Sequence, residues 1–256
     1  MPVSFAVVNQ KGGVGKTTTT VNLAAYLATF GKKILLIDID PQSNASVGFG
    51  VDRQKIERCL YNVLIEGLPA EEAIVKTSIA NLDVLPSTPK LAGAEVELVS
   101  IEPRETRLKQ ALYNLKEPYD YIIIDCPPSL SLLTVNALGA VQEVIIPIQC
   151  EYYALEGISQ LTHTLELVRE SLNPELKIRG IVLTMYDHRT ILSAQVAEET
   201  RKYFGPKVFQ TVIPRNVRLA EAPSFGQPII FYDPGSKGAA AYENLCREVL
   251  GDGHAQ

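Results

Sequence analysis

Residues 10–18 read Gln-Lys-Gly-Gly-Val-Gly-Lys-Thr-Thr, a spacing typical of a phosphate-binding loop. The usual pattern is G-x-x-x-x-G-K-[ST]; Gly15, Lys16 and Thr17 match its second half, while Gln10 stands where the first glycine is expected. In such a loop backbone N–H groups converge on phosphate oxygens, the lysine neutralises the β- and γ-phosphates, and the hydroxyl binds Mg²⁺. We therefore expect a nucleoside triphosphate to contact Lys11, Gly12, Gly13, Val14, Gly15, Lys16, Thr17 and Thr18.

Lys11 is one lysine more than a single nucleotide requires. Lys16 already suits the stabilisation of charge on a transferred phosphoryl group. P-loop enzymes that lack a charge-stabilising finger hydrolyse slowly, and a finger from a partner can add about 10³–10⁵ in rate. Lys11 could supply such a charge to the nucleotide of a second subunit. It could also contact its own nucleotide or solvent, and the spacing leaves both alternatives open.

Two apolar segments, Ile34–Asp38 and Tyr121–Asp125, end in aspartate, and Asp40 follows the first of them. Functional groups gather at the carboxyl ends of strands in open α/β sheets. Alternation along an extended chain places Asp38 and Asp40 on the same side. We expect Asp40 to orient or activate the attacking water, Asp38 to support Mg²⁺ through water or to order the loop, and Asp125 to bind Mg²⁺. The alternative is that these are ordinary polar residues at strand ends.

These groups must be positioned by a sheet, and short β-branched apolar runs do alternate with longer helical stretches. That alternation is typical of a parallel sheet with helices on both faces. We expect strands at Val3–Val8, Lys33–Asp38, Leu82–Pro86, Tyr119–Asp125, Glu143–Pro147, Ile178–Met185 and Val208–Ile213. We expect helices at Thr17–Phe30, Leu91–Leu115, Leu132–Leu138, Ala154–Ser171, Leu192–Phe204 and Lys237–Leu250. The prediction is one doubly wound, mostly parallel α/β P-loop domain over residues 1–250, then a short polar tail, 251–256.

The composition narrows the class of protein further. Four scattered cysteines and three dispersed histidines show no metal-ligand spacing, which favours reduced thiols and no metal site made only of protein ligands. No apolar run approaches the roughly 18 residues of a membrane span, and a strand-like segment starts at residue 3 where a signal peptide would stand. We expect a cytoplasmic protein.

The charge is distributed unevenly along the chain. The formal net charge is −5, yet residues 177–237 carry nine basic and five acidic side chains. A basic surface on an acidic protein can bind nucleic acid. Charge alone does not distinguish this from a solvated surface of mixed charge.

Several separated segments together resemble a known family. Lys11–Thr18, Asp38–Gln42 and Asp125–Pro128 look like the deviant Walker A ATPases of the MinD/ParA superfamily. Segments 125–138, 183–187 and 213–226 narrow the resemblance to ParA/Soj chromosome- and plasmid-partition proteins. The resemblance extends over nearly the whole chain, from about residue 3 to about residue 250.

The resemblance implies an ATPase with ATP and Mg²⁺ as cofactors, which forms a nucleotide-sandwich homodimer when it holds ATP. Lys11 would then reach the phosphates of the partner subunit, and Asp40 matches the residue needed for hydrolysis. Pro214 and Asn216 match positions that contact adenine.

The resemblance also implies function on the nucleoid. The ATP-bound dimer would bind double-stranded DNA without sequence preference, and a ParB/Spo0J-type centromere-binding partner would stimulate hydrolysis and release it. Arg189 and Arg218 match positions implicated in DNA contact in Soj-like proteins, and Arg215 could extend that patch. The alternative is that these arginines form surface salt bridges.

Two other functions remain open from the sequence. A MinD-like membrane-positioning ATPase would carry a basic amphipathic C-terminal helix, but residues 243–256 contain one arginine and no lysine, a poor membrane anchor. A metabolic P-loop enzyme of the same fold, such as a synthetase that transfers phosphate to a small acid, would require a shaped acceptor pocket.

Overall fold

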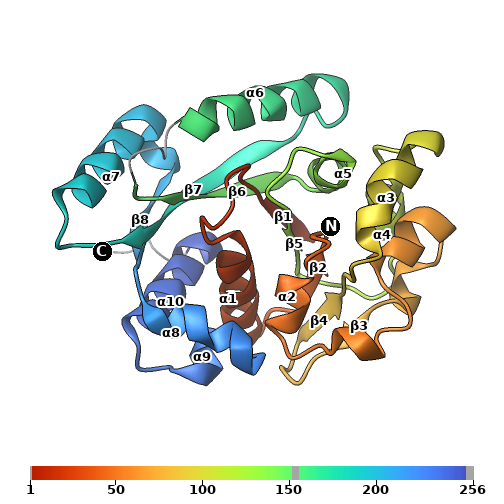
Figure 1. Cartoon of the computed structure of the whole chain (residues 1–256), viewed down its shortest axis with the longest axis horizontal. Coiled ribbons are helices and arrows are strands. Elements are labelled where there is room, and N and C mark those ends of the chain that lie inside the picture. The colour runs from red at the N-terminus through yellow and green to blue at the C-terminus, as the bar shows by residue number, and fades with distance from the viewer. Residues whose placement is uncertain (1, 152–155, 252–256) are drawn as a thin grey trace.

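A computed structural model describes residues 2–151 and 156–251. Its central element is one eight-stranded sheet in the order β3-β4-β2-β5-β1-β6-β7-β8, shown in Figure 1. Every neighbouring pair is parallel except β3 and β4, which are antiparallel. The strands are β1 (Val3–Val7), β2 (Ile34–Asp38), β3 (Val75–Lys76), β4 (Leu82–Leu85), β5 (Tyr121–Asp125), β6 (Glu143–Gln149), β7 (Lys177–Tyr186) and β8 (Val208–Pro214).

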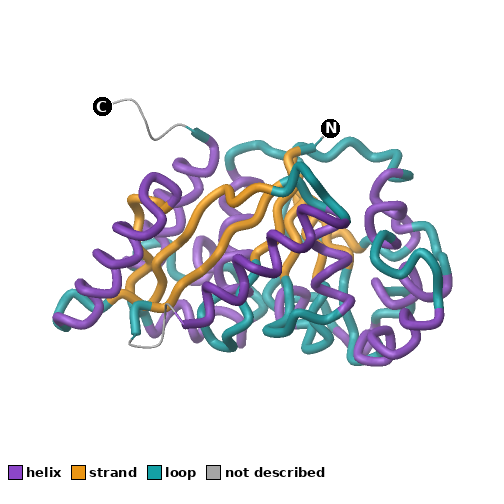
Figure 2. Tube along the Cα trace, turned by 90° about the horizontal axis from the view of Figure 1, so that it is seen from above, coloured by secondary structure: helices purple, strands orange, loops and turns teal. Residues whose placement is uncertain are grey.

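Helices cover both faces of this sheet (Figures 1 and 2). They are α1 (Lys16–Thr29), α2 (Asn44–Val47), α3 (Leu91–Glu97), α4 (Arg107–Tyr113), α5 (Leu132–Ala140), α6 (Glu156–Ser171), α7 (Ile191–Phe204), α8 (Val217–Glu221), α9 (Ile229–Tyr232) and α10 (Lys237–Leu250).

Two hydrophobic clusters fill the space between the sheet and its two helical layers. Ala6 and Val8 belong to the cluster under α3–α7, whereas Phe5 and Val7 belong to the cluster under α1, α9 and α10. Successive side chains of a strand point to opposite faces, so a strand buried on both faces must be apolar throughout. This confirms the expected fold class and explains the continuous apolar runs.

The seven expected strands are present, with ends within two residues of the expected ones. The expected helix Leu91–Leu115 is wrong: α3 ends at Glu97, a 3₁₀ turn follows, and α4 starts only at Arg107. Pro103 lies between them, and a proline inside a helix removes a hydrogen bond and clashes with the preceding turn.

The short elements β3, α2, α8 and α9 are too brief to produce a periodic pattern and were not expected. The expected helix Ala154–Ser171 corresponds to α6, but its first two residues lie outside the described part of the chain. The same holds for the expected polar tail after Gly251.

Candidate functional site

The phosphate-binding loop connects the carboxyl end of β1 to α1. Gly15 precedes the helix in the left-handed conformation, at φ 88°, which a residue with a side chain adopts only at a cost. Lys16 is 6% exposed, and its Nζ donates to the carbonyl of Lys11 at 3.0 Å. The hydroxyl of Thr184, on β7, donates to the carbonyl of Val14 at 2.8 Å. The loop thus curves around the free N–H groups at the start of α1, an arrangement that suits an anion.

Asp125 lies at the end of β5, next to β1, and is fully buried. Its Oδ2 accepts from Thr17 Oγ1 at 2.8 Å, and its Oδ1 accepts from Thr20 Oγ1 at 2.9 Å. Thr17 and Asp125, both expected to bind Mg²⁺, are therefore neighbours. Thr20 was not expected, although its position one helical turn after Thr17 indicates the same face of α1.

Asp38 lies at the end of β2, paired in register with Asp125, and is also fully buried. Its Oδ2 accepts from both the N–H and the hydroxyl of Ser46, each at 2.7 Å, and its Oδ1 accepts from the N–H of Asp40 at 3.2 Å. Asp38 thus contacts the segment after β2, and its expected role, in supporting Mg²⁺ or in ordering the loop, stays a prediction. Ser46, which lies eight residues away, was not expected.

Asp40 is 7% exposed, and its Oδ1 accepts from the N–H of Gln42 at 2.9 Å. Burial raises the pKa of Asp125, and the neighbouring carboxylate of Asp38 raises it further. Burial likewise raises the pKa of Asp38. Burial lowers the pKa of Lys16, against the opposing effect of Asp125. The hydroxyl of Thr17 and the carboxylate of Asp125 are oxygen donors of the kind that Mg²⁺ prefers, so this edge fits the ion expected there.

A cavity of about 320 Å³ adjoins the phosphate loop. Gly15 and Thr18 line it from the loop side, and Pro214 and Asn216 line it from the segment joining β8 to α8. Asn216 is also the N-cap of α8, because its Oδ1 accepts from the N–H of Arg218 at 2.8 Å. The two residues expected at adenine are therefore brought beside the expected phosphate site from about 200 residues away along the chain; their contact with a base stays a prediction.

Two buried polar atoms among the described residues have no hydrogen-bond partner, Gln10 Nε2 and Ser131 Oγ. They lie in the segments after β1 and β5, which are adjacent strands of the sheet. A buried polar atom without a partner costs about 1–3 kcal/mol. Both atoms therefore lie beside the edge of the sheet that carries the phosphate loop and Asp125.

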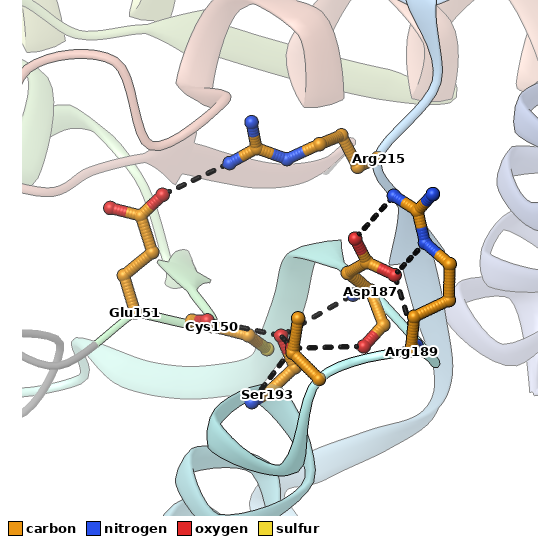
Figure 3. A network of polar contacts seen from close by, with 7 residues as sticks. Cys150, Glu151, Asp187, Arg189, Ser193 and Arg215 are labelled. Carbon is orange, nitrogen blue, oxygen red and sulfur yellow. Dashed lines mark hydrogen bonds and ion pairs between the residues drawn. The ribbon is translucent and has the colours of Figure 1, made fainter.

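The three arginines expected to contact DNA all carry intramolecular ion pairs. Arg215 pairs with Glu151 at 3.0 Å. Figure 3 shows this pair above the one that Arg189 forms with Asp187. Arg189 Nε and Nη2 donate to the two oxygens of Asp187 at 2.9 and 2.8 Å, which lowers the pKa of that carboxyl.

Arg218, on α8, pairs with Glu221 at 2.9 Å and with Asp233 at 3.3 Å. The salt bridges weighed as the alternative are therefore present in the structure. Ion pairs between exposed side chains of this kind are weak, and contact of these arginines with DNA stays a prediction.

The four cysteines are buried as thiols. In the part of the chain that the structure describes, no cluster of three His, Cys, Asp or Glu side chains is arranged around a metal position. Within the same residues, no helix combines the length and the apolar character of a membrane span.

Comparison with known proteins agrees with this site. Residues 4–178 match a family model described as an AAA domain. The chain is 58% identical to the sporulation initiation inhibitor protein Soj of Bacillus subtilis over 249 residues, which cover 97% of this chain and 98% of that protein. It is 56% identical to the chromosome partitioning protein ParA of Myxococcus xanthus, over 96% of this chain and 87% of that protein.

Among solved structures, it is similar to cobyrinic acid a,c-diamide synthase of Mycobacterium smegmatis with bound ADP and magnesium. The TM-score is 0.86 at 37% identity, over 98% of this chain and 94% of that one. That name describes a metabolic enzyme, one of the alternatives that the sequence left open. The Soj and ParA relatives share considerably more identity over the same length. The phosphate loop, the acidic strand ends and these relatives together show that the chain belongs to the ParA/Soj family of chromosome-partitioning ATPases.

Proposed function

We propose that the protein is an ATP-dependent DNA-segregation switch. The observation that carries the proposal is the convergence of Lys16, Thr17, Asp40 and Asp125 at one edge of the sheet, beside a cavity lined by Pro214 and Asn216. ATP would occupy this edge with its phosphates in the loop, and Thr17 and Asp125 would hold the Mg²⁺ that neutralises their charge.

The residues of this chain divide the work of hydrolysis between them. The loop amides and Lys16 stabilise the charge that builds up on the transferred phosphoryl group. Asp40 orients the attacking water, and Asp38 holds the loop that carries Asp40. Lys11, at the start of the loop, contacts the phosphates bound by a second subunit. ATP binding therefore drives dimerisation.

The dimer binds DNA without sequence preference through Arg189, Arg215 and Arg218, which suits a protein that uses the cytoplasmic nucleoid as a surface. Contacts between arginines and phosphates do not depend on sequence and weaken with salt. A ParB-type partner stimulates hydrolysis, and the resulting ADP state leaves the DNA. Relatives named for chromosome partitioning support this role.

A membrane-positioning role has less support, because the apolar face of α10 is already packed against the core. Tyr242, Leu245, Cys246 and Val249 are all buried in the cluster that α10 shares with α1. A helix packed in this way would have to leave the core before it could bind a lipid surface.

The test is co-sedimentation of the protein with DNA, and separately with anionic vesicles, in the presence of ATP, ADP or no nucleotide. Only the DNA pellet with ATP should contain the protein. Asp40→Ala, which should bind ATP without hydrolysing it, should increase that fraction and make it persist. DNA retention independent of nucleotide, or normal turnover by Asp40→Ala, would contradict the proposal.

A further inference from the structure

Asn9 is a buried amide between the end of β1 and the phosphate loop, with 7% of its surface exposed. Its Nδ2 donates to the carbonyl of Pro147, on β6, at 2.7 Å. Its Oδ1 accepts from the backbone N–H of Lys11 at 2.9 Å. One side chain therefore ties the main chain of Lys11 to a central strand.

The first of these bonds takes the place of a bond of the sheet. Val8 N–H donates to the carbonyl of Ile145 at 3.0 Å, which is the last backbone bond from β1 to β6. In a parallel ladder alternate residues bond to the same neighbouring strand, so the carbonyl of Pro147 would next accept from residue 10. Asn9 Nδ2 supplies that donor instead. The chain can thus leave the sheet while the carbonyl of Pro147 keeps a donor.

Pro147 fits this position for the same reason. The N–H that proline lacks would donate to the carbonyl of Val8, where the ladder to β1 ends, so at most this one terminal bond is missing. The carbonyl of Pro147 is left free to accept from Asn9.

Lys11 has a second main-chain tie, from Lys16 Nζ to the Lys11 carbonyl. The glycines that follow give no further support: Gly12 and Gly13 are exposed, and a Cβ built at either would have no heavy atom within 4 Å. Under the proposed function, Lys16 turns to the β- and γ-phosphates when ATP binds. The bond from Asn9 then remains to hold the backbone of Lys11.

We propose that Asn9 is the positioning residue of Lys11: it holds the main chain so that the lysine side chain is directed to the nucleotide of the partner subunit. This inference rests on the proposed function. The inference predicts different effects on nucleotide binding by one subunit and on dimerisation. The amides expected to hold phosphate lie after Lys11, and the backbone of Val14 has its own hydrogen bond to Thr184. Loss of Asn9 should weaken the dimer far more than it weakens nucleotide binding by one subunit.

The test compares Asn9→Ala and Asn9→Asp with the wild type. The aspartate variant keeps the shape and the acceptor for Lys11 but loses the donor to Pro147, so it serves if the alanine variant does not fold. Asn173→Ala is the matched control, because Asn173 is also buried and also bridges main-chain carbonyls, those of Leu138 and Val141, away from the loop.

Two constants are measured: the affinity of the monomer for fluorescent ADP, and the dimer dissociation constant with a non-hydrolysable ATP analogue, from sedimentation. Both Asn9 variants should raise the dimer constant about tenfold, the effect of one or two lost buried hydrogen bonds, and change ADP affinity less than about twofold. Asn173→Ala should leave both constants unchanged.

Dimerisation of the Asn9 variants at the wild-type concentration, or an equal loss of ADP affinity, would overturn the positioning role alone. A wild-type protein that fails to dimerise with the analogue would overturn the proposed function and this inference together.

Discussion

At the scale of single residues, we expect a side chain at Gly12 to prevent dimerisation without destabilising the fold. A Cβ there meets nothing within 4 Å, and its φ lies outside the left-handed region. We therefore expect Gly12→Val to leave the free energy of unfolding within about 0.5 kcal/mol of the wild type, as for other exposed sites. The added isopropyl group would occupy the approach to the phosphates and to a partner, so ATP-dependent dimerisation should be lost.

Thermal unfolding and sedimentation with an ATP analogue check this prediction. Gly235→Val is a suitable control, because Gly235 is also exposed and its nearest atom, Asp233 Oδ1, is at 3.9 Å. A lower unfolding temperature for Gly12→Val alone would show that the glycine serves the fold of the loop.

The raised pKa of Asp125 should make the free energy of unfolding depend on pH. Burial and Asp38 raise its pKa in the folded state, so above about pH 4, where an unfolded aspartate has lost its proton, the folded state binds more protons than the unfolded state. The free energy of unfolding should then fall as pH rises, by at most about 1.4 kcal/mol per pH unit for one proton. Asp125→Asn should reduce this slope.

Denaturant unfolding of the nucleotide-free protein from pH 5 to pH 8 measures both slopes. Mg²⁺ with ADP should stabilise the wild type at pH 8, since the ion relieves the repulsion between buried carboxylates, and should stabilise Asp125→Asn less. Identical slopes for the two proteins would show that Asp125 is not the group responsible.

At the scale of elements, β8 is an edge strand whose free backbone groups are covered by side chains. Glu248, on α10, accepts from the N–H groups of Gln210 and Thr211 at 2.8 and 2.7 Å. Arg201, on α7, donates to the carbonyls of Phe209 and Gln210, each at 3.1 Å. An uncovered edge can pair with another chain, so these two residues protect the sheet.

Glu248→Ala should therefore destabilise the protein by about 1–3 kcal/mol, the contribution of hydrogen bonds to a charged group. Faster amide exchange at Gln210 and Thr211 should accompany that loss. Glu243→Ala is the control, since Glu243 lies on the same helix and pairs with Arg247 at the surface. Unchanged exchange at residues 210 and 211 would contradict the assignment.

At the scale of the whole molecule, the sheet order places the basic quarter of the chain at one edge, because β7 and β8 are its last strands. Arg189→Glu and Arg218→Glu should each abolish ATP-dependent retention on DNA and leave ADP binding intact, because both arginines are exposed and neither lines the cavity beside the phosphate loop. Filter binding over a salt series measures the effect.

Arg58→Glu is the control. Arg58 is an exposed arginine that pairs with Glu72, and Glu72 lies just before β3, at the opposite edge of the sheet. DNA binding by both variants that equals the wild type and ignores salt would remove the proposed patch.

Much of the fold and of the site was predictable because its signals are local. Strands buried on both faces need unbroken apolar runs, and a phosphate loop needs glycines and a lysine at set spacing. Pro103 is an equally local signal, and it argues against the long helix expected over Leu91–Leu115. Ser46 and Asn9 were not identified as part of the site, because no spacing in the sequence indicates their partners. Thr20 was missed although its position one helical turn after Thr17 places it on the same face of α1.

The sequence by itself determined the class of fold, the family and the set of groups that suit phosphate, since these depend on residue types over short stretches. Only the tertiary structure decided which of those groups meet. Parallel strands end at a common edge, and their order brings Asp38 and Asp125 into register and sets Pro214 and Asn216 beside the phosphate loop. It also decided that the three arginines expected at DNA are paired with acids, and that Asn9 holds Lys11. Some of these contacts, such as those of Asn9 with Pro147 and of Arg215 with Glu151, join residues distant in the chain. Others, such as the Arg189–Asp187 pair, are local, but residue spacing alone does not decide whether they form.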